Sequence, residues 1–241
     1  MKGWKLVKAA EFIDFNPRES ISKGVMAKKV AMEHLQPFTK DIPTYEVATF
    51  NGGSKFRNGD TLMARITPCL ENGKTAQVGI LEDGEVGFGS TEFIVLRAKS
   101  NVSDKDFIYY LAMSPILRDN AIKSMVGSSG RQRVQQGVLN DTEFYAPPLS
   151  EQIEIGCILR ALDYKIANNT KINHHLTLVS SATDSSPDIR RGRRESRRAA
   201  RLTFSARLIP ICSNKGVTNS VNAVTSLFSN ATVGRFAICA G

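Results

Sequence analysis

Short apolar runs separated by turn-forming residues characterise the first part of the chain. Candidate strands cover Tyr45–Phe50, Thr61–Ile66, Thr75–Leu81 and Glu92–Leu96. Each run has the length of a strand and is bounded by turn signals that contain Gly, Asn, Asp or Ser. The turn sequences Asn51–Ser54, Glu71–Lys74 and Glu82–Glu85 favour hairpins. The pattern therefore predicts a twisted β-sheet arranged as a meander or a partial barrel.

Helical spacing follows the strands. Apolar side chains recur three and four positions apart within Phe107–Met113 and Ile116–Met125. Ser103–Asp106 supplies an N-cap and acidic first-turn residues for the first helix, and Pro115 favours a new first turn at the second. Short helices beside a sheet place this region in the α+β class.

A longer helix is predicted after Pro147 and Pro148, which end the preceding structure, with Ser150 as its cap. Its apolar positions advance by three and four residues and form one stripe, which includes Ile155, Ile158, Leu159, Leu162 and Ile166. Such a stripe needs an apolar partner, which either the preceding domain or another helix could provide. We expect a helix of coiled-coil type as far as Leu176.

Charge is unevenly distributed along the chain. The 32 Lys and Arg against 23 Asp and Glu give a net charge of +9, but residues 1–176 hold 22 basic and 20 acidic side chains, and residues 177–241 hold 10 and 3. Helical periodicity is lost at Thr177, and Arg190–Arg201 is rich in arginine. We therefore expect residues 177–241 to form a largely disordered tail. Bulk charge indicates little about the ligand of the first 176 residues.

No residue pattern predicts a catalytic site or a metal site. The histidines are His34 and the adjacent pair His174 and His175, and neighbours on a helix point about 100° apart, which disfavours a shared metal ion. Gly87–Thr91 has the glycines of a phosphate loop but lacks its lysine and its spacing. No catalytic site is visible in the sequence, and we expect neither a cofactor nor a metal.

The cysteines and the N-terminal sequence bear on the compartment. Cys69, Cys157, Cys212 and Cys239 are widely separated, which favours free thiols in a reducing compartment. The N-terminal segment lacks the apolar region of a secretory signal, and no apolar stretch reaches membrane-spanning length. We expect a cytoplasmic protein that does not bind a membrane.

Polar side chains suited to DNA lie on the expected loops of the β-rich region. Arg and Lys neutralise phosphates, and Arg, Asn and Gln can bond in pairs to base edges. The candidates are Lys55, Arg57, Arg65, Asn72, Lys74, Ser90, Thr91, Arg131, Gln132 and Arg133. Solvation alone also makes loops polar, so this composition is compatible with an ordinary surface. Arg131–Arg133, beside a Gly and Ser run, is the strongest candidate.

Three segments in this order resemble one known family. They are Gly59–Pro68 with Asn72–Lys74, then Gly87–Arg97, then Pro147–Ile153 with Leu162–Ile166. Together they resemble the specificity subunit of type I restriction-modification enzymes, over residues 1–176.

The resemblance implies a fold, a function and partners. Residues 1–146 would form a target recognition domain that reads one half of a split sequence in double-stranded DNA, and residues 147–176 would begin a spacer helix. In this family paired helices set the gap between the half-sites and hold the methyltransferase subunits, through which the restriction subunit is bound. Two half-subunits could also pair through their helices as a homodimer. The resemblance also implies that this chain is not an enzyme, because methylation and cleavage belong to the partner subunits.

The tail departs from the family pattern. Family helices continue past the position of His175, and a second recognition domain usually follows, whereas here a Ser- and Arg-rich segment begins. A different reading frame or a joined gene fragment would explain this change, and a functional basic tail is the alternative. Two further hypotheses therefore stay open, a nonspecific polyanion binder acting through Arg190–Arg201 and an inactive gene fragment.

Overall fold

The computed structural model describes residues 3–128 and 130–184, which divide after Arg160 into two units. The strands are β1 (Lys5–Lys8), β2 (Ile13–Phe15), β3 (Met26–Val30), β4 (Glu46–Thr49), β5 (Ser54–Phe56), β6 (Thr61–Ala64), β7 (Thr75–Gln77), β8 (Gly87–Gly89), β9 (Phe93–Ala98) and β10 (Glu143–Ala146). The helices are α1 (Ala9–Phe12), the 3-10 helix η1 (Met32–His34), α2 (Lys105–Met113), α3 (Pro115–Lys123), α4 (Gln136–Asn140) and α5 (Leu149–Asp184). The predicted α+β class is confirmed.

The strands form three sheets, ordered β1-β10, β2-β9-β6-β7 and β4-β3-β8-β5. β3 and β8 are parallel, and the other pairs are antiparallel. The expected meander is wrong, and none of the sheets in the described residues closes into a barrel. The turn after β4 leads to β5 at the opposite edge of the same sheet, because a turn sequence reverses the chain locally but does not choose the strand that it will pair with.

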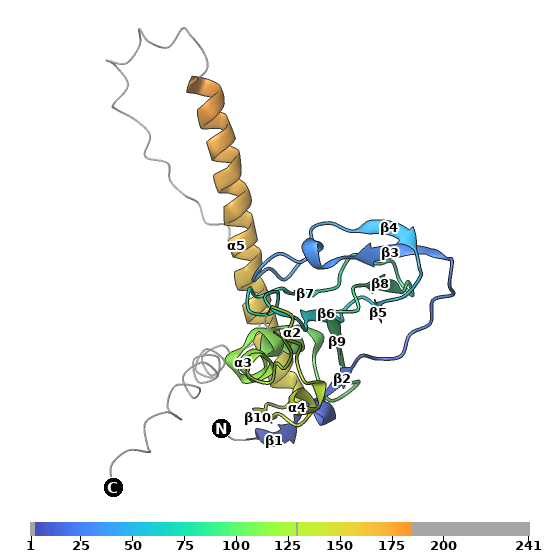
Figure 1. The fold of residues 1–241 in the computed structure, drawn as a ribbon. Coiled ribbons are helices and arrows are strands. Elements are labelled where there is room, and N and C mark those ends of the chain that lie inside the picture. The colour runs from blue at the N-terminus through green and yellow to red at the C-terminus, as the bar shows by residue number, and fades with distance from the viewer. Residues whose placement is uncertain (1–2, 129, 185–241) are drawn as a thin grey trace. The chain divides into compact units, whose positions relative to one another are not determined.

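The sheet β2-β9-β6-β7 is buried on both faces. Leu62 and Val95 belong to one apolar cluster, while their neighbours Met63 and Ile94 belong to the other. The sheet β4-β3-β8-β5 contributes to the first cluster and helices α2 to α4 to the second, and Figure 1 shows these layers on either side of β6 and β9. Burial on both faces explains why β6 and β9 have continuous apolar sequences.

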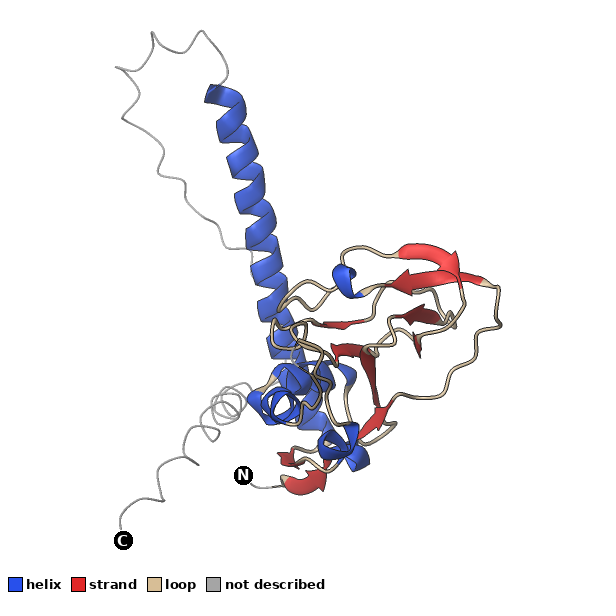
Figure 2. Ribbon diagram, viewed as in Figure 1, coloured by secondary structure: helices blue, strands red, loops and turns tan. Residues whose placement is uncertain are grey.

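Helices α2 and α3 begin where the sequence predicts. The Asp104 side chain accepts hydrogen bonds from the backbone N–H groups of Asp106 (3.0 Å) and Phe107 (2.9 Å) and so caps α2. Pro115 occupies the first turn of α3. Both predictions are confirmed, and Figure 2 shows these helices gathered on one side of the strands.

Helix α5 is anchored at its first turns to the preceding domain. The Gln152 side chain is 1% exposed; its Oε1 accepts a hydrogen bond from the N–H of Asp104 (2.9 Å), and its Nε2 donates to the carbonyl oxygens of Val102 (3.1 Å) and Pro147 (2.9 Å). On the same helix, the guanidinium of Arg160 donates to the carboxylate of Asp106 (3.1 Å). Gln152, in the motif that follows Pro147 and Pro148, therefore attaches the start of α5 to the preceding domain.

Helix α5 continues to Asp184, past the end expected at Leu176. The loss of apolar periodicity at Thr177 was therefore the wrong signal for a helix end, because Ser, Thr and Ala tolerate helical backbone and the first proline comes only at Pro187. The rest of the predicted tail, residues 185–241, lies outside the described residues. None of the helices in residues 3–184 is both long enough and apolar enough to cross a membrane.

A buried ion-pair network connects three segments of the domain. Arg97 on β9 donates from Nε and NH2 to the two carboxylate oxygens of Asp60, both at 2.7 Å, and from NH1 to Glu19 at 2.6 Å. The backbone N–H of Arg57 also donates to Asp60 (2.7 Å), which closes the turn before β6. Asp60 is 1% exposed, so its charge depends on these partners for compensation.

We expect Asp60→Asn to lower the free energy of unfolding by about 3 kcal/mol, because it removes the charge that compensates Arg97. Urea-induced unfolding followed by far-UV circular dichroism measures this loss. The control is Glu46→Gln, which breaks the partly exposed pair between Glu46 and Lys29 (3.2 Å) and should cost at most about 1 kcal/mol. Equal losses in the two variants would contradict a central role for Asp60.

A second prediction concerns the glycine pair before β5. Gly52 and Gly53 both have positive φ (143° and 120°), but only at Gly53 would a Cβ overlap another backbone group, the carbonyl oxygen of Gly89. We expect Gly53→Ala to lower the free energy of unfolding by about 2 kcal/mol more than Gly52→Ala, because both variants share the backbone strain and only one adds the overlap. Matched urea titrations test this difference.

Candidate nucleic-acid interface

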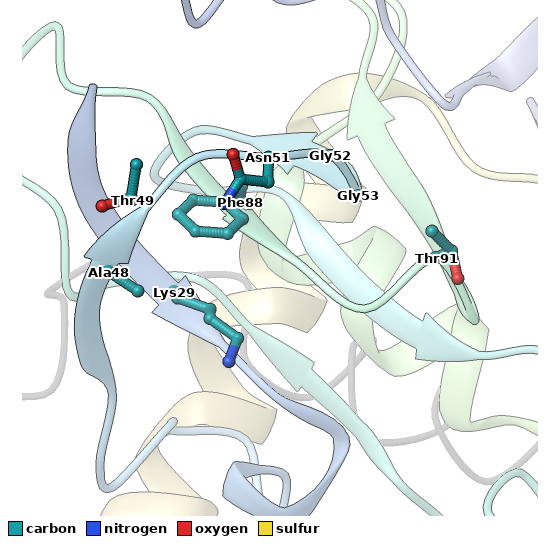
Figure 3. A pocket seen from close by; sticks show the side chains of 8 residues that line it. All are labelled: Lys29, Ala48, Thr49, Asn51, Gly52, Gly53, Phe88 and Thr91. Carbon is teal, nitrogen blue, oxygen red and sulfur yellow. The ribbon is translucent and has the colours of Figure 1, made fainter. Parts of the chain in front are cut away.

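Two shallow hollows adjoin on the surface of residues 3–160. The first has a volume of about 410 Å³, and Figure 3 shows Lys29, Thr49 and Asn51 around the ring of Phe88. The second has a volume of about 470 Å³, and its lining includes Arg18, Glu19, Lys55 and Arg65. Gly53 and Thr91 line both hollows, which therefore form one continuous surface.

Basic side chains gather along the second hollow and the loop beside it. We call the following set the basic face: Arg18, Lys55, Arg57, Arg65, Arg131 and Arg133, with the carboxylates Glu19 and Glu92. The Lys55 ammonium donates to the backbone carbonyl oxygen of Glu19 (3.0 Å). Because a carbonyl oxygen has no net charge, this contact does not compensate the positive charge of Lys55. With six cations and two carboxylates in this set, the basic face carries a net positive charge.

Glu19 connects the basic face to the buried network. Its carboxylate accepts hydrogen bonds from Arg57 (2.7 Å) and Arg97 (2.6 Å). Burial alone would raise the pKa of Glu19, but these two guanidinium groups hold it below its ordinary value. Glu19 therefore stays ionised at neutral pH and fixes the loop that carries Arg18.

The loop of residues 126–133 brings the candidates Arg131, Gln132 and Arg133 beside Arg65. The backbone carbonyl of Gln132 accepts from the N–H of Thr67 (3.0 Å), and Ile66 forms an antiparallel bridge with Arg133. The side chain of Arg131 is exposed and that of Gln132 is half-buried. These residues come from positions that are distant in the sequence and meet through backbone pairing.

Glu92 lies between two of these arginines. Its carboxylate accepts hydrogen bonds from Nε (3.0 and 3.1 Å) and NH2 (2.7 Å) of Arg133, and Nε of Arg65 lies 3.9 Å away. The hydrogen bonds from Arg133 hold the pKa of Glu92 below its usual value. Ser90, another sequence candidate, accepts a hydrogen bond at Oγ from the N–H of Glu92 (3.1 Å) and so shapes this turn.

Asn72 and Lys74 line neither hollow, and they lie at the far end of the connection between β6 and β7, which begins at Arg65. The Lys74 ammonium donates to the carbonyl oxygen of Met32 (2.9 Å). Between them, Gly73 packs on the ring of Phe38, close enough that a Cβ would lie 2.7 Å from the ring. The structure thus brings together most of the predicted DNA-binding side chains, whereas these two do not line the hollows.

The predicted stripe of helix α5 has two different environments. Ile155 is 1% exposed and belongs to the domain core, and Leu159 packs against that core. Ile158 is half-buried, whereas Leu162 and Ile166 are 50% and 64% exposed. The preceding domain is therefore the apolar partner of the first turns, and the exposed part begins at Leu162.

Sequence reasoning missed several members of this surface. Arg18 and Glu19 lie in a polar segment, and their charges were the available signal. Lys29 and Asn51 entered no candidate set, although both line the first hollow. No local signal marks Glu92, because its role comes from arginines 27 and 41 positions away in the sequence.

One group of potential metal ligands occurs among the described residues, formed by Glu33, His34 and Glu46. His34 accepts a hydrogen bond at Nδ1 from the N–H of Ala31 (3.1 Å). The neutral ring then carries its proton on Nε2, the nitrogen that faces Glu46 at 3.9 Å. This arrangement suits a hydrogen bond to the carboxylate better than a metal ion.

Two curated relatives match this chain. The EcoAI specificity subunit of Escherichia coli is 28% identical over 158 residues, and the EcoEI specificity subunit of the same organism is 28% identical over 159 residues. Each match covers 64% of this chain and 27% of the relative. The chain thus spans about a quarter of the length of these type I restriction enzyme subunits.

Solved structures share the fold. The HsdS subunit from Thermoanaerobacter tengcongensis superposes with a TM-score of 0.59 at 19% identity, covering 76% of this chain and 48% of that chain. A chain from a structure of a type I R-M system superposes with a TM-score of 0.55 at 16% identity. This match covers 76% of this chain and 47% of that chain. The family described as the type I restriction modification DNA specificity domain matches residues 1–178. Since this match covers well over half of the 241 residues, the chain belongs to that family.

Proposed function

We propose that this protein is a noncatalytic DNA-recognition module of a type I restriction-modification system. Residues 1–146 read one half of a bipartite target in double-stranded DNA. Residues 147–176 form the beginning of a spacer helix that binds protein partners. The observation that carries the proposal is the basic face, which three separate segments build on a domain of the specificity family. Methylation and cleavage reside in partner subunits, and this chain needs no cofactor for binding.

The chemistry of the basic face suits a DNA duplex. Its net positive charge attracts phosphates and releases counterions, which gives affinity without sequence preference. Arg131 and Gln132 add exposed and half-exposed groups with the paired geometry that reads base edges. Asn72 and Lys74, at the far end of the connection that begins at Arg65, are proposed as contacts to the DNA backbone beside the basic face.

Substitutions on the loop of residues 126–133 test this proposal. We expect Arg131→Ala or Gln132→Ala to weaken binding of an enriched duplex by about 1–3 kcal/mol and to relax base preference at one position. The duplex is obtained by enrichment from a randomised library with the full chain and its methyltransferase subunit. Lys5→Ala, which removes an exposed charge on β1, is the control and should change neither quantity. Equal losses on all sequences would identify phosphate contacts instead.

The basic tail is the source of a competing function. If Arg190–Arg201 made this chain a nonspecific polyanion binder, deletion of residues 185–241 would abolish retention on DNA. A recognition module instead keeps its selectivity after the deletion, with weaker and less salt-dependent nonspecific binding. A chain that neither enriches a sequence nor copurifies with a methyltransferase subunit would be an inactive fragment.

The exposed part of helix α5 supports the proposed protein partners. Leu162 and Ile166 are exposed, and Ile172 (53%) and Leu176 (60%) continue the apolar positions at roughly helical spacing. Exposed apolar side chains in such a row are typical of a helix that pairs with another helix. We propose that this row binds the methyltransferase subunit or a second copy of the chain, and through the methyltransferase the restriction subunit.

We expect the double variant Leu162→Asp with Ile166→Asp to abolish association with the methyltransferase subunit and any self-association, because it places two charges in the apolar row. Analytical ultracentrifugation measures both. Tyr164→Asp is the matched control, since Tyr164 is 60% exposed on the opposite side of the helix and should tolerate the charge. Retained association of the double variant, with helicity unchanged, would refute this role of the helix.

A further inference from the structure

We propose that Glu92 is a positioning residue for base recognition, whose carboxylate orients the guanidinium group of Arg133 beside Arg65 on the basic face. This inference rests on the proposed DNA-binding function. Glu92 would by its charge alone repel DNA. The inference gives this acidic residue a role in sequence selectivity.

The contact between Glu92 and Arg133 determines the direction of the guanidinium. Nε and NH2 form one edge of that group, and both donate to the carboxylate at 2.7–3.1 Å. Two donors on one edge fix the plane of the group, which a single hydrogen bond would leave free to rotate. Among the described residues none accepts a hydrogen bond from NH1 of Arg133, so that nitrogen remains available to an acceptor from outside. The Arg133 side chain is 45% exposed, and such an acceptor can reach it.

Backbone hydrogen bonds hold the three residues at fixed separations. The N–H of Arg65 donates to the carbonyl of Glu92 (2.9 Å), and the N–H of Val134 donates to the carbonyl of Arg65 (2.9 Å). Arg133 and Val126 exchange two hydrogen bonds of 3.0 Å across the loop. The backbone positions are therefore fixed by the fold, and the side-chain directions are what Glu92 adds.

Arg65 has an incomplete set of partners. Its Nε is buried, lies 3.9 Å from the carboxylate and has no hydrogen-bond acceptor within the described residues. Because Nε itself is inaccessible, an acceptor from outside can reach this side chain only at its exposed part, and the side chain is 36% exposed. A phosphate or base oxygen at that exposed part would bind Arg65 while Glu92 continues to hold Arg133.

Glu92→Gln separates positioning from simple charge. The variant keeps the size of the side chain but removes the negative charge and one of the two strong acceptors. Loss of a negative charge raises affinity for every duplex, whereas loss of orientation lowers affinity for the selected sequence alone. The two roles therefore predict different changes in the ratio of specific to nonspecific binding.

The experiment uses the full chain with its methyltransferase subunit, a duplex enriched by the wild type from a randomised library, and a poly(dI-dC) duplex as the nonspecific probe. We expect Glu92→Gln to reduce the ratio of the two affinities about tenfold, with affinity for poly(dI-dC) unchanged or increased. Arg133→Lys keeps the charge but cannot bond in the same two-donor geometry, and it should reduce the ratio as well. Glu82→Gln, which removes an equal charge at a side chain that is 88% exposed, should leave the ratio unchanged.

A double variant distinguishes positioning from a general effect on folding. In the Arg133→Ala background, Glu92→Gln should change the ratio little, because the group that Glu92 orients is gone. An unchanged ratio in Glu92→Gln, or an equal reduction with and without Arg133, would overturn the inference. A wild-type chain that enriches no sequence would instead overturn the proposed function. Thermal melting of each variant verifies that the fold is retained.

Discussion

The buried carboxylate of Asp60 makes the interactions on which the basic face depends. Its two oxygens accept both donors of one edge of Arg97, and one of them also accepts the backbone N–H of Arg57. Arg97 then bonds to Glu19, so the turn before β6, the strand β9 and the loop that carries Arg18 are held together. A buried charge requires such compensation, and the same arrangement fixes the backbone from which the basic side chains project.

A second anchor joins the domain to helix α5. Gln152 is buried and makes three hydrogen bonds to backbone groups, and Asp106 accepts hydrogen bonds from both Arg160 (3.1 Å) and Lys40 (2.7 Å). Gly156 permits the close approach, since a Cβ there would lie 3.0 Å from Asp106. Polar contacts thus fix the first turns of the helix on the domain, and the apolar side chains after Arg160 stay exposed for the partners that we propose.

Local chemistry predicted four of the ten strands in the described residues and the longer helices, and it predicted the pairing of the strands poorly. The cap at Asp104, the first turn at Pro115 and the apolar runs that became β6 and β9 all depend on neighbouring residues, so they could be identified from the sequence. Strand order depends on which faces meet in the core. β3 pairs with both β4 and the distant β8, an arrangement that the turn at Asn51–Ser54 could not reveal. The end of α5 was also missed, because a change in composition is a weak helix terminator.

The sequence by itself determined the family, the α+β class and the loops whose side chains suit DNA, because motifs and residue chemistry are local properties. Only the tertiary structure decided which candidates share a surface: it gathers Lys55, Arg65 and Arg133 on the basic face, whereas Lys74 lines neither hollow. It also introduced Arg18 and Glu19, which no motif marks, and Glu92, which lies within the segment Gly87–Arg97 but was not a candidate for the site. Their roles come from hydrogen bonds between residues far apart in the sequence, and the packing of two sheets and three helices brings those residues together.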